Sequence, residues 1–166
     1  GLNDDSVLNV TSWAIRFSGD TTVKNLRLNS TANHQFLLAC GNTLVIDENV
    51  RVSGNEGVKN LLGIRGGGDA NAINGGTNVI IKSGKWGAVH GGTRLEDVFG
   101  DTHITVYDTA SISMARGGND SPADDHHSVH GNTVMELVGS KCTVVNLVKS
   151  ADVLGGTYLD LTDYKG

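Results

Sequence analysis

The sequence repeats one short motif along most of its length. The motif is glycine, then Asp, Asn or Gly, then threonine, and its six copies occupy residues 19–21, 41–43, 75–77, 100–102, 131–133 and 155–157. Subtracting successive threonine numbers gives spacings of 22, 34, 25, 31 and 24 residues. Spacings of about 20 to 50 residues are typical of solenoids and repeat arrays. The chain is therefore expected to stack equivalent segments on one another.

Each motif predicts a sharp corner followed by a strand. Glycine, Asn and Asp tolerate the left-handed backbone that such a corner requires. Residues two and four positions after the threonine are expected to share one face of the strand and to point into the core. In the last four copies these residues are Val79 and Ile81, Ile104 and Val106, Met135 and Leu137, and Leu159 and Leu161.

These spacings leave room for two or three short strands in each repeat. They predict an all-β fold, a right-handed parallel β-helix of about five to six coils. The 23 glycines favour tight corners over helices. We expect one module over residues 1–166, with residues 1–20 as an irregular first coil or cap. A final strand left bare would expose an unpaired edge, so the module is expected to be part of a larger multidomain protein.

Composition and charge exclude several classes of partner. The chain has 38% hydrophobic and 19% charged residues, which suits one folded core. Its net charge of −5 and its lack of a basic stripe exclude nucleic acid as a partner. No apolar run reaches the roughly 20 residues of a membrane span, so no membrane partner is expected. Cys40 and Cys142 lie about four coils apart and are predicted to be separate buried thiols.

A second pattern recurs between the threonine motifs. Glycine pairs follow Ile64-Arg65, Val89-His90 and Ala115-Arg116, at spacings of 25 and 26 residues. The second residue of each pair is expected to project outward, so Arg65, His90 and Arg116 should form a column across neighbouring coils. Trp86 lies four residues before His90 and joins this column if the strand extends that far. An indole beside stacked hydrogen-bond donors is typical of sugar binding. Alternatively, Trp86 fills the core and the arginines are solvated.

Residues 119–130 hold the densest cluster of polar ligand types, including Asp124, Asp125 and His130. Carboxylates and imidazoles bind metals and also serve acid-base chemistry. The spacing matches no EF-hand, calcium-binding repeat or zinc motif. We therefore expect a loop that contributes hydrogen bonds to a ligand, with a calcium ion as the alternative and no other cofactor.

The outward face of the main strands is a second candidate surface, because it carries Tyr107 and Tyr158. A glycan could lie across this face, and the alternative is a solvated sheet. Glycoside hydrolysis needs two carboxyl groups on either side of the scissile bond. No pair stands out among the candidates, so no catalytic residue is predicted. The candidates are Asp97, Asp101, Asp124, Asp125, Glu136 and Asp160.

The corner motifs and the segment Gly-Ala-Val-His-Gly-Gly-Thr at residues 87–93 resemble β-helical repeats in large extracellular proteins of gut bacteria. More narrowly, the chain from about Thr21 onward is similar to a family of carbohydrate-binding modules with a parallel β-helix fold. These modules are attached to xylan-degrading glycoside hydrolases from herbivore gut microbes. The resemblance implies an extracellular or cell-surface module that binds xylan or xylo-oligosaccharides without catalysis, beside a covalently linked enzyme domain.

Two other classes of function remain open. A β-helical lyase or hydrolase would require a deep groove with paired acids, or a Lys or Arg beside a carboxylate. A structural stalk or adhesin segment would bind no ligand. Many functions share the β-helix, so the fold alone does not separate these classes.

Overall fold

In the computed structural model the described residues are 6–59, 61–120, 127–148 and 153–165. They form β-strands and contain no helix, so the predicted all-β class is confirmed. The strands are β1 (Val7–Val10), β2 (Ala14–Arg16), β3 (Thr21–Val23), β4 (Arg27–Ser30), β5 (Phe36–Leu38), β6 (Thr43–Ile46), β7 (Arg51–Gly54), β8 (Gly63–Arg65), β9 (Thr77–His90), β10 (Thr102–Arg116), β11 (Thr133–Val138), β12 (Thr143–Val148) and β13 (Thr157–Asp160).

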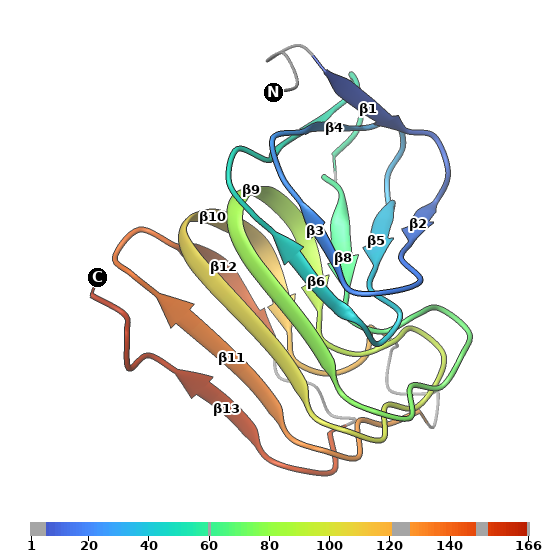
Figure 1. Ribbon diagram of the computed structural model, residues 1–166, viewed down its shortest axis with the longest axis vertical. Helices are drawn as coiled ribbons and strands as arrows, with labels where there is room; N and C mark the ends of the chain where they lie inside the picture. Colours follow the sequence, from blue (N-terminus) through green and yellow to red (C-terminus); the bar gives the residue numbers. More distant parts are fainter. Residues whose placement is uncertain (1–5, 60, 121–126, 149–152, 166) are drawn as a thin grey trace.

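The strands pair in parallel and fall into three rows. The first row is β1, β4 and β7, which forms a separate three-stranded sheet. The second row, here called the arginine row, contains β2, β5, β8, the ends of β9 and β10, and β12. The third, the threonine row, contains β3, β6, the beginnings of β9 and β10, β11 and β13. Figure 1 shows β9 and β10 as long curved strands that link the arginine and threonine rows.

Every copy of the threonine motif is followed by a strand of the threonine row, as predicted. Strands β3, β6, β9, β10, β11 and β13 all begin at the motif threonine. The last four threonines are aligned across β9, β10, β11 and β13. The first copies are offset by one residue, because Thr21 pairs with Leu44 and Thr43 with Asn78.

The apolar residues of these strands build the core. Val79, Ile81, Ile104 and Val106 are fully buried, as expected from their alternation. The last copy differs, because Leu159 is 47% exposed and Leu161 is similarly open. No described strand pairs with the far side of β13, which lies at the end of the molecule away from β1 (Figure 1). The expectation that this last pair is buried is therefore wrong for the isolated chain.

The motif glycines are needed for a reason that differs from the one predicted. Of the motif residues only Gly41 has a positive φ, of 83°. At Gly76, Gly100, Gly131 and Gly155, glycine instead allows one corner to stack directly on the next. A Cβ at Gly76 would lie 2.5 Å from the carbonyl oxygen of Asp101, and a Cβ at Gly100 would lie 2.5 Å from the nitrogen of Gly76. The glycines thus remove steric bulk between layers of backbone.

The two repeated sequence patterns contact each other in the folded chain. The hydroxyls of Thr77 and Thr102 are buried and donate to the carbonyl oxygens of Gly91 and Gly117, both at 2.6 Å. A Cβ at Gly66 would lie 2.8 Å from the Thr77 side chain. Thr77 at the start of β9 therefore requires glycine at position 66, directly after the end of β8. The two cysteines are both free thiols, as predicted, with Cys142 buried and Cys40 half-buried.

Adjacent glycines of one motif provide a direct test of this stacking. We expect Gly76→Ala to lower the free energy of unfolding by about 2 kcal/mol or more, because the new methyl group would overlap the backbone at Asp101. Gly75→Ala is the matched control. Its Cβ would meet no atom within 4 Å, and we expect a change within about 1 kcal/mol. Urea denaturation of both variants measures the difference, and equal stabilities would contradict the stacking argument.

Candidate functional site

Arg65, His90 and Arg116 lie side by side at the ends of β8, β9 and β10. Arg65 is in register with His90, and His90 is in register with Arg116. The residues before them, Ile64, Val89 and Ala115, are fully buried in the core, as the alternation predicted. The three polar residues therefore occupy one column on the opposite face of the arginine row.

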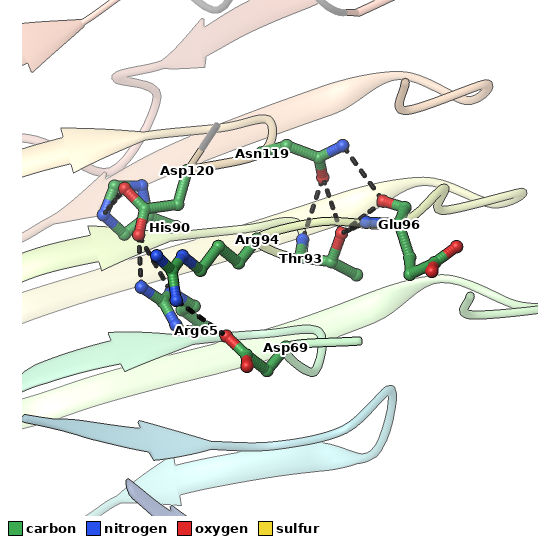
Figure 2. A network of polar contacts seen from close by, with 8 residues as sticks. All are labelled: Arg65, Asp69, His90, Thr93, Arg94, Glu96, Asn119 and Asp120. Carbon is green, nitrogen blue, oxygen red and sulfur yellow. Dashed lines mark hydrogen bonds and ion pairs between the residues drawn. The ribbon is translucent and has the colours of Figure 1, made fainter. Parts of the chain in front are cut away.

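This column is covered, which the sequence did not suggest. Arg65 is only 4% exposed and His90 only 1%. The chain beyond β10 returns over them and places the Asp120 carboxylate between the two side chains (Figure 2). Nε and Nη2 of Arg65 donate to Oδ2 of Asp120, with Nε at 3.0 Å, and Nη1 lies 3.3 Å from Oδ1 of Asp69. The expectation of solvent-facing side chains is therefore wrong for these two residues.

Asn119 holds the returning segment in place. Its side-chain oxygen accepts a hydrogen bond of 2.8 Å from the backbone N–H of Thr93, and its Nδ2 donates to the carbonyl oxygen of Glu96 at 3.2 Å (Figure 2). The backbone N–H of Asp120 donates to the carbonyl oxygen of Thr93 at 2.8 Å. A Cβ at Gly92 would collide with the Asn119 side chain. Gly92, two residues after His90, thus provides the space in which this segment docks.

Burial sets the charge state of His90. It lowers the pKa of His90 to about 4; nearby Asp120 opposes this shift, and Arg65 and Arg116 add to it. The imidazole is therefore neutral near pH 7. Neither ring nitrogen makes a hydrogen bond to a described residue, although Nε2 lies 3.2 Å from Oδ1 of Asp120. Burial also lowers the pKa of Arg65, and the carboxylates of Asp120 and Asp69 counteract this effect.

A hollow of about 590 Å³ opens beside the column, across strands of the arginine row. This volume is in the range of small-ligand sites. Two aromatic side chains line it, and each faces an arginine. The Arg65 guanidinium lies 3.8 Å from the centre of the Phe36 ring, and the Arg16 guanidinium lies 4.6 Å from the centre of the Trp13 ring. The remaining lining residues are His34, Lys59, Leu61, Gly87, Ala88, His90, Arg94, Ser113, Met114 and Asp120.

Trp13 and Phe36 provide different surfaces. Trp13 is 41% exposed, whereas Phe36 is buried under Arg65. The two are linked through the backbone, because the N–H of Phe36 donates to the carbonyl oxygen of Trp13 at 2.9 Å. The exposed indole is thus fixed at the edge of the hollow.

Trp86 does not belong to this site. Its side chain is fully buried in the main core, and its indole N–H donates to the carbonyl oxygen of Ser83 at 2.9 Å. Trp86 and Val89 both point into the core although three positions separate them, while Ala88 lines the hollow. Strand β9 therefore changes the face it presents between Trp86 and His90. The prediction that the indole shares the face of His90 is wrong, and the alternative that it fills the core is correct.

The other predicted residues are dispersed. Arg116 is half-buried, and its Nη1 donates to the carbonyl oxygen of Asn119 at 3.2 Å. Tyr107 lies in the threonine row opposite Val138, and the hollow lies along the arginine row. His130 is exposed at the far end of the loop, 3.4 Å from Asp97, and it stacks on Phe99. Asp124 and Asp125 lie outside the described residues. Of the predicted residues, Arg65 and His90 therefore lie at the hollow, and Arg116 continues their column on the neighbouring strand.

A calcium site in the loop gains no support from the part that is described. Within residues 6–59, 61–120, 127–148 and 153–165, no three His, Cys, Asp or Glu side chains form a group that could hold a metal. Asn119 and Asp120 bind Thr93, Glu96, Arg65 and His90 instead. Residues 121–126 lie outside the described chain.

Sequence reasoning missed Trp13, Phe36 and Asp120. The column pattern could have led to Phe36. Strand Phe36–Leu38 aligns with Gly63–Arg65, so it continues the row of Arg65 towards the N-terminus. Ala14–Arg16 aligns in turn with Phe36–Leu38, which places Trp13 one residue before the same row. Asp120 lies in the polar segment 119–130, but no local signal pairs it with Arg65, which is 55 residues away in the sequence.

The buried imidazole predicts a specific loss of stability in acid. Between pH 6.5 and about 4 the unfolded chain binds a proton at His90 that the folded chain does not. The stability contributed by neutral His90 is complete above pH 6.5 and decreases as the pH falls towards 4. Between pH 7 and 4.5 we expect the wild type to lose about 2 kcal/mol more than His90→Gln in urea denaturation. The pKa values of Asp47, Asp97 and Asp160 are also lowered, but both proteins share these effects. Equal losses would show that His90 is not buried in the neutral form.

Removing the Asp120 charge tests the ion pair that Asp120 forms with buried Arg65. We expect Asp120→Asn to destabilise the protein by about 2 to 3 kcal/mol, because Arg65 would remain buried with one carboxylate fewer. Asp47→Asn removes a carboxylate from the more exposed Lys82 pair and should cost clearly less, because solvent screens that pair. Combining Asp120→Asn with Arg65→Met should recover part of the loss, since the uncompensated charge is then absent. Equal effects of the two asparagine substitutions would contradict the buried pair.

Comparisons with known proteins identify no family for this chain. No family model matches it, and the searches of curated proteins and of solved structures also give no match. Because the described residues contain no helix, none of them forms a helix able to cross a membrane. The geometry of the hollow and the resemblance seen in the sequence are therefore what indicate a function for this chain.

Proposed function

We propose that this chain is a non-catalytic carbohydrate-binding module that recognises a plant cell-wall polysaccharide, with xylan as the first candidate. The observation that carries the proposal is the hollow, which combines an exposed indole with hydrogen-bonding side chains. In this proposal the module is extracellular or displayed on the cell surface, and it directs a covalently attached glycoside hydrolase to its substrate. Xylan and the attached enzyme come from the family resemblance in the sequence.

The proposal includes the fold, a right-handed parallel β-helix of about five to six coils. The order of the strands supports it. From β1 to β9 the chain visits the first, arginine and threonine rows in turn and then returns to the first. Each return adds a parallel strand to every row. Such a stack would offer a long surface along which a polysaccharide chain could lie.

The chemistry of the hollow suits a sugar. An indole packs against the C–H face of a pyranose ring, and Trp13 is exposed and held against Arg16. His34, Lys59, Arg94 and Ser113 are exposed around the hollow and supply hydrogen-bond donors for hydroxyl groups. One stacked ring and several solvent-competing hydrogen bonds support dissociation constants of about micromolar to millimolar.

One observation favours a catalytic alternative, a β-helical lyase or glycoside hydrolase. Arg65 lies against Asp120 and beside His90, and a lyase would need such a cation next to a carboxylate. However, Arg65 and His90 are almost inaccessible, and Arg65 binds both Asp69 and Asp120. Glycoside hydrolysis needs one carboxyl group free to donate a proton. The geometry therefore favours binding. The third class, a structural stalk or adhesin segment, would leave the hollow without a ligand.

Affinity electrophoresis through gels that contain xylan, mixed-linkage glucan, mannan or pectin tests the proposal. We expect the wild type to be retarded by a polysaccharide without releasing reducing sugar. Trp13→Ala should weaken binding about tenfold or more, because it removes the exposed ring while the core stays intact. Tyr158→Ala removes an exposed aromatic residue of the threonine row and should leave binding unchanged.

The other outcomes point to other functions. Loss of binding in Tyr158→Ala alone would move the site to the face of Tyr107 and Tyr158. Release of sugar would favour the enzyme. Failure of every polysaccharide to retard the protein would favour the stalk.

A further inference from the structure

The hollow is surrounded by basic side chains, although the chain as a whole carries a net charge of −5. Lys59, Arg65 and Arg94 line it, whereas Asp120 is the one carboxylate among the described residues that line it. A further cation, Arg16, lies over the Trp13 ring at the edge. A concave surface with an excess of one charge attracts ligands of the opposite charge. The local charge therefore selects for an anionic ligand.

Two of the three cations that line the hollow remain accessible to a ligand. Arg65 is buried and already binds Asp120 and Asp69. Arg94 is exposed, and its recorded ion pair, with Asp69, spans 3.8 Å. The Lys59 side chain is exposed, and no carboxylate within the described ranges is recorded within ion-pair distance of it. Lys59 and Arg94 thus provide positive charge that the carboxylates of the described residues do not neutralise fully.

The acids near the hollow limit how much negative charge a ligand can carry. Asp120 lines the hollow, and Asp69 lies within 3.8 Å of Arg94. Like charges brought close together in a partly buried site are unfavourable. A single carboxylate near Lys59 and Arg94 fits this balance better than a doubly charged phosphate. Neutral His90 adds no charge to the hollow.

We propose that the hollow recognises an acidic sugar, a uronic acid unit whose carboxylate binds Lys59 and Arg94 while its ring packs on Trp13. This inference rests on the proposed glycan-binding function and specifies the class of sugar. Guanidinium and carboxylate groups form strong charge-assisted hydrogen bonds, which would orient the unit as well as attract it. The polymer backbone would extend from this unit along the arginine row.

Isothermal titration calorimetry with matched oligosaccharides tests the proposal. The probes are a linear xylo-oligosaccharide, the same backbone carrying one glucuronic acid, and a galacturonic acid oligomer of similar length. We expect at least one of the two acidic probes to bind about tenfold more tightly than the neutral probe at low salt. This advantage should shrink as sodium chloride is raised to about 300 mM, because salt screens exposed charges.

A charge-matched pair of variants assigns the effect to the hollow. Lys59→Gln combined with Arg94→Gln should remove most of the preference for the acidic probe and leave binding of the neutral probe within about twofold. The control is Lys24→Gln combined with Lys141→Gln, which removes the same charge from exposed residues that do not line the hollow. This control should keep the preference. Circular dichroism checks that both variants are folded.

The outcomes separate this inference from the proposed function. Equal binding of neutral and acidic probes would overturn the uronate assignment while glycan binding stands. A sulfated oligosaccharide of similar length serves as a further probe. The uronate assignment would also be overturned if this probe bound more tightly than both uronates. An equal loss of preference in both double variants would show that net charge, and not the hollow, is responsible. Failure of all probes and of all the polysaccharides above to bind would overturn both proposals.

Discussion

Parallel stacking of backbone on backbone is the constraint on which the rest of this structure depends. Adjacent strands in a sheet lie about 4.8 Å apart, so a corner that repeats in every layer has no room for a side chain between the layers. Gly76 and Gly100 meet this requirement, since a Cβ on either would overlap the neighbouring backbone. The buried hydroxyl of Thr77 then satisfies the carbonyl oxygen of Gly91, which the corner would otherwise leave unpaired. Steric and hydrogen-bonding demands therefore favour glycine and threonine at the corners where the layers meet most closely.

The same stacking creates the hollow. The ends of β8, β9 and β10 are in register. This register alone aligns Arg65, His90 and Arg116 in a column. The buried Arg65 guanidinium would be unfavourable alone, and the segment after β10 compensates by placing Asp120 against it. Gly92 leaves the space in which Asn119 docks that segment. The basic edge of the hollow is then provided by Lys59 and Arg94, which lie farther out and keep their exposure.

Local signals predicted the strands and the column but not the residues around the hollow. All six motif threonines begin strands, because glycine and threonine act on the backbone within a few residues of themselves. Trp86 was misplaced because the change of face along β9 depends on packing and not on alternation. Asp120 was missed because it meets Arg65 across 55 residues of sequence. Trp13 fell within residues 1–20, which were expected to form an irregular first coil or cap, although its row could have been found by extending the column pattern towards the N-terminus.

The sequence alone determined the all-β class, the starts of the repeated strands and the alignment of Arg65 with His90 and Arg116. These features follow from residue chemistry that acts over one corner or one strand. The tertiary structure decided which faces are covered, which is why Trp86 is in the core and Trp13 is at the edge of the hollow. It also decided the neutral state of His90, because desolvation depends on every element packed around the ring. The burial of a side chain and the balance of charge around it depend on contacts between segments that are distant in the sequence, so a local sequence pattern does not predict them.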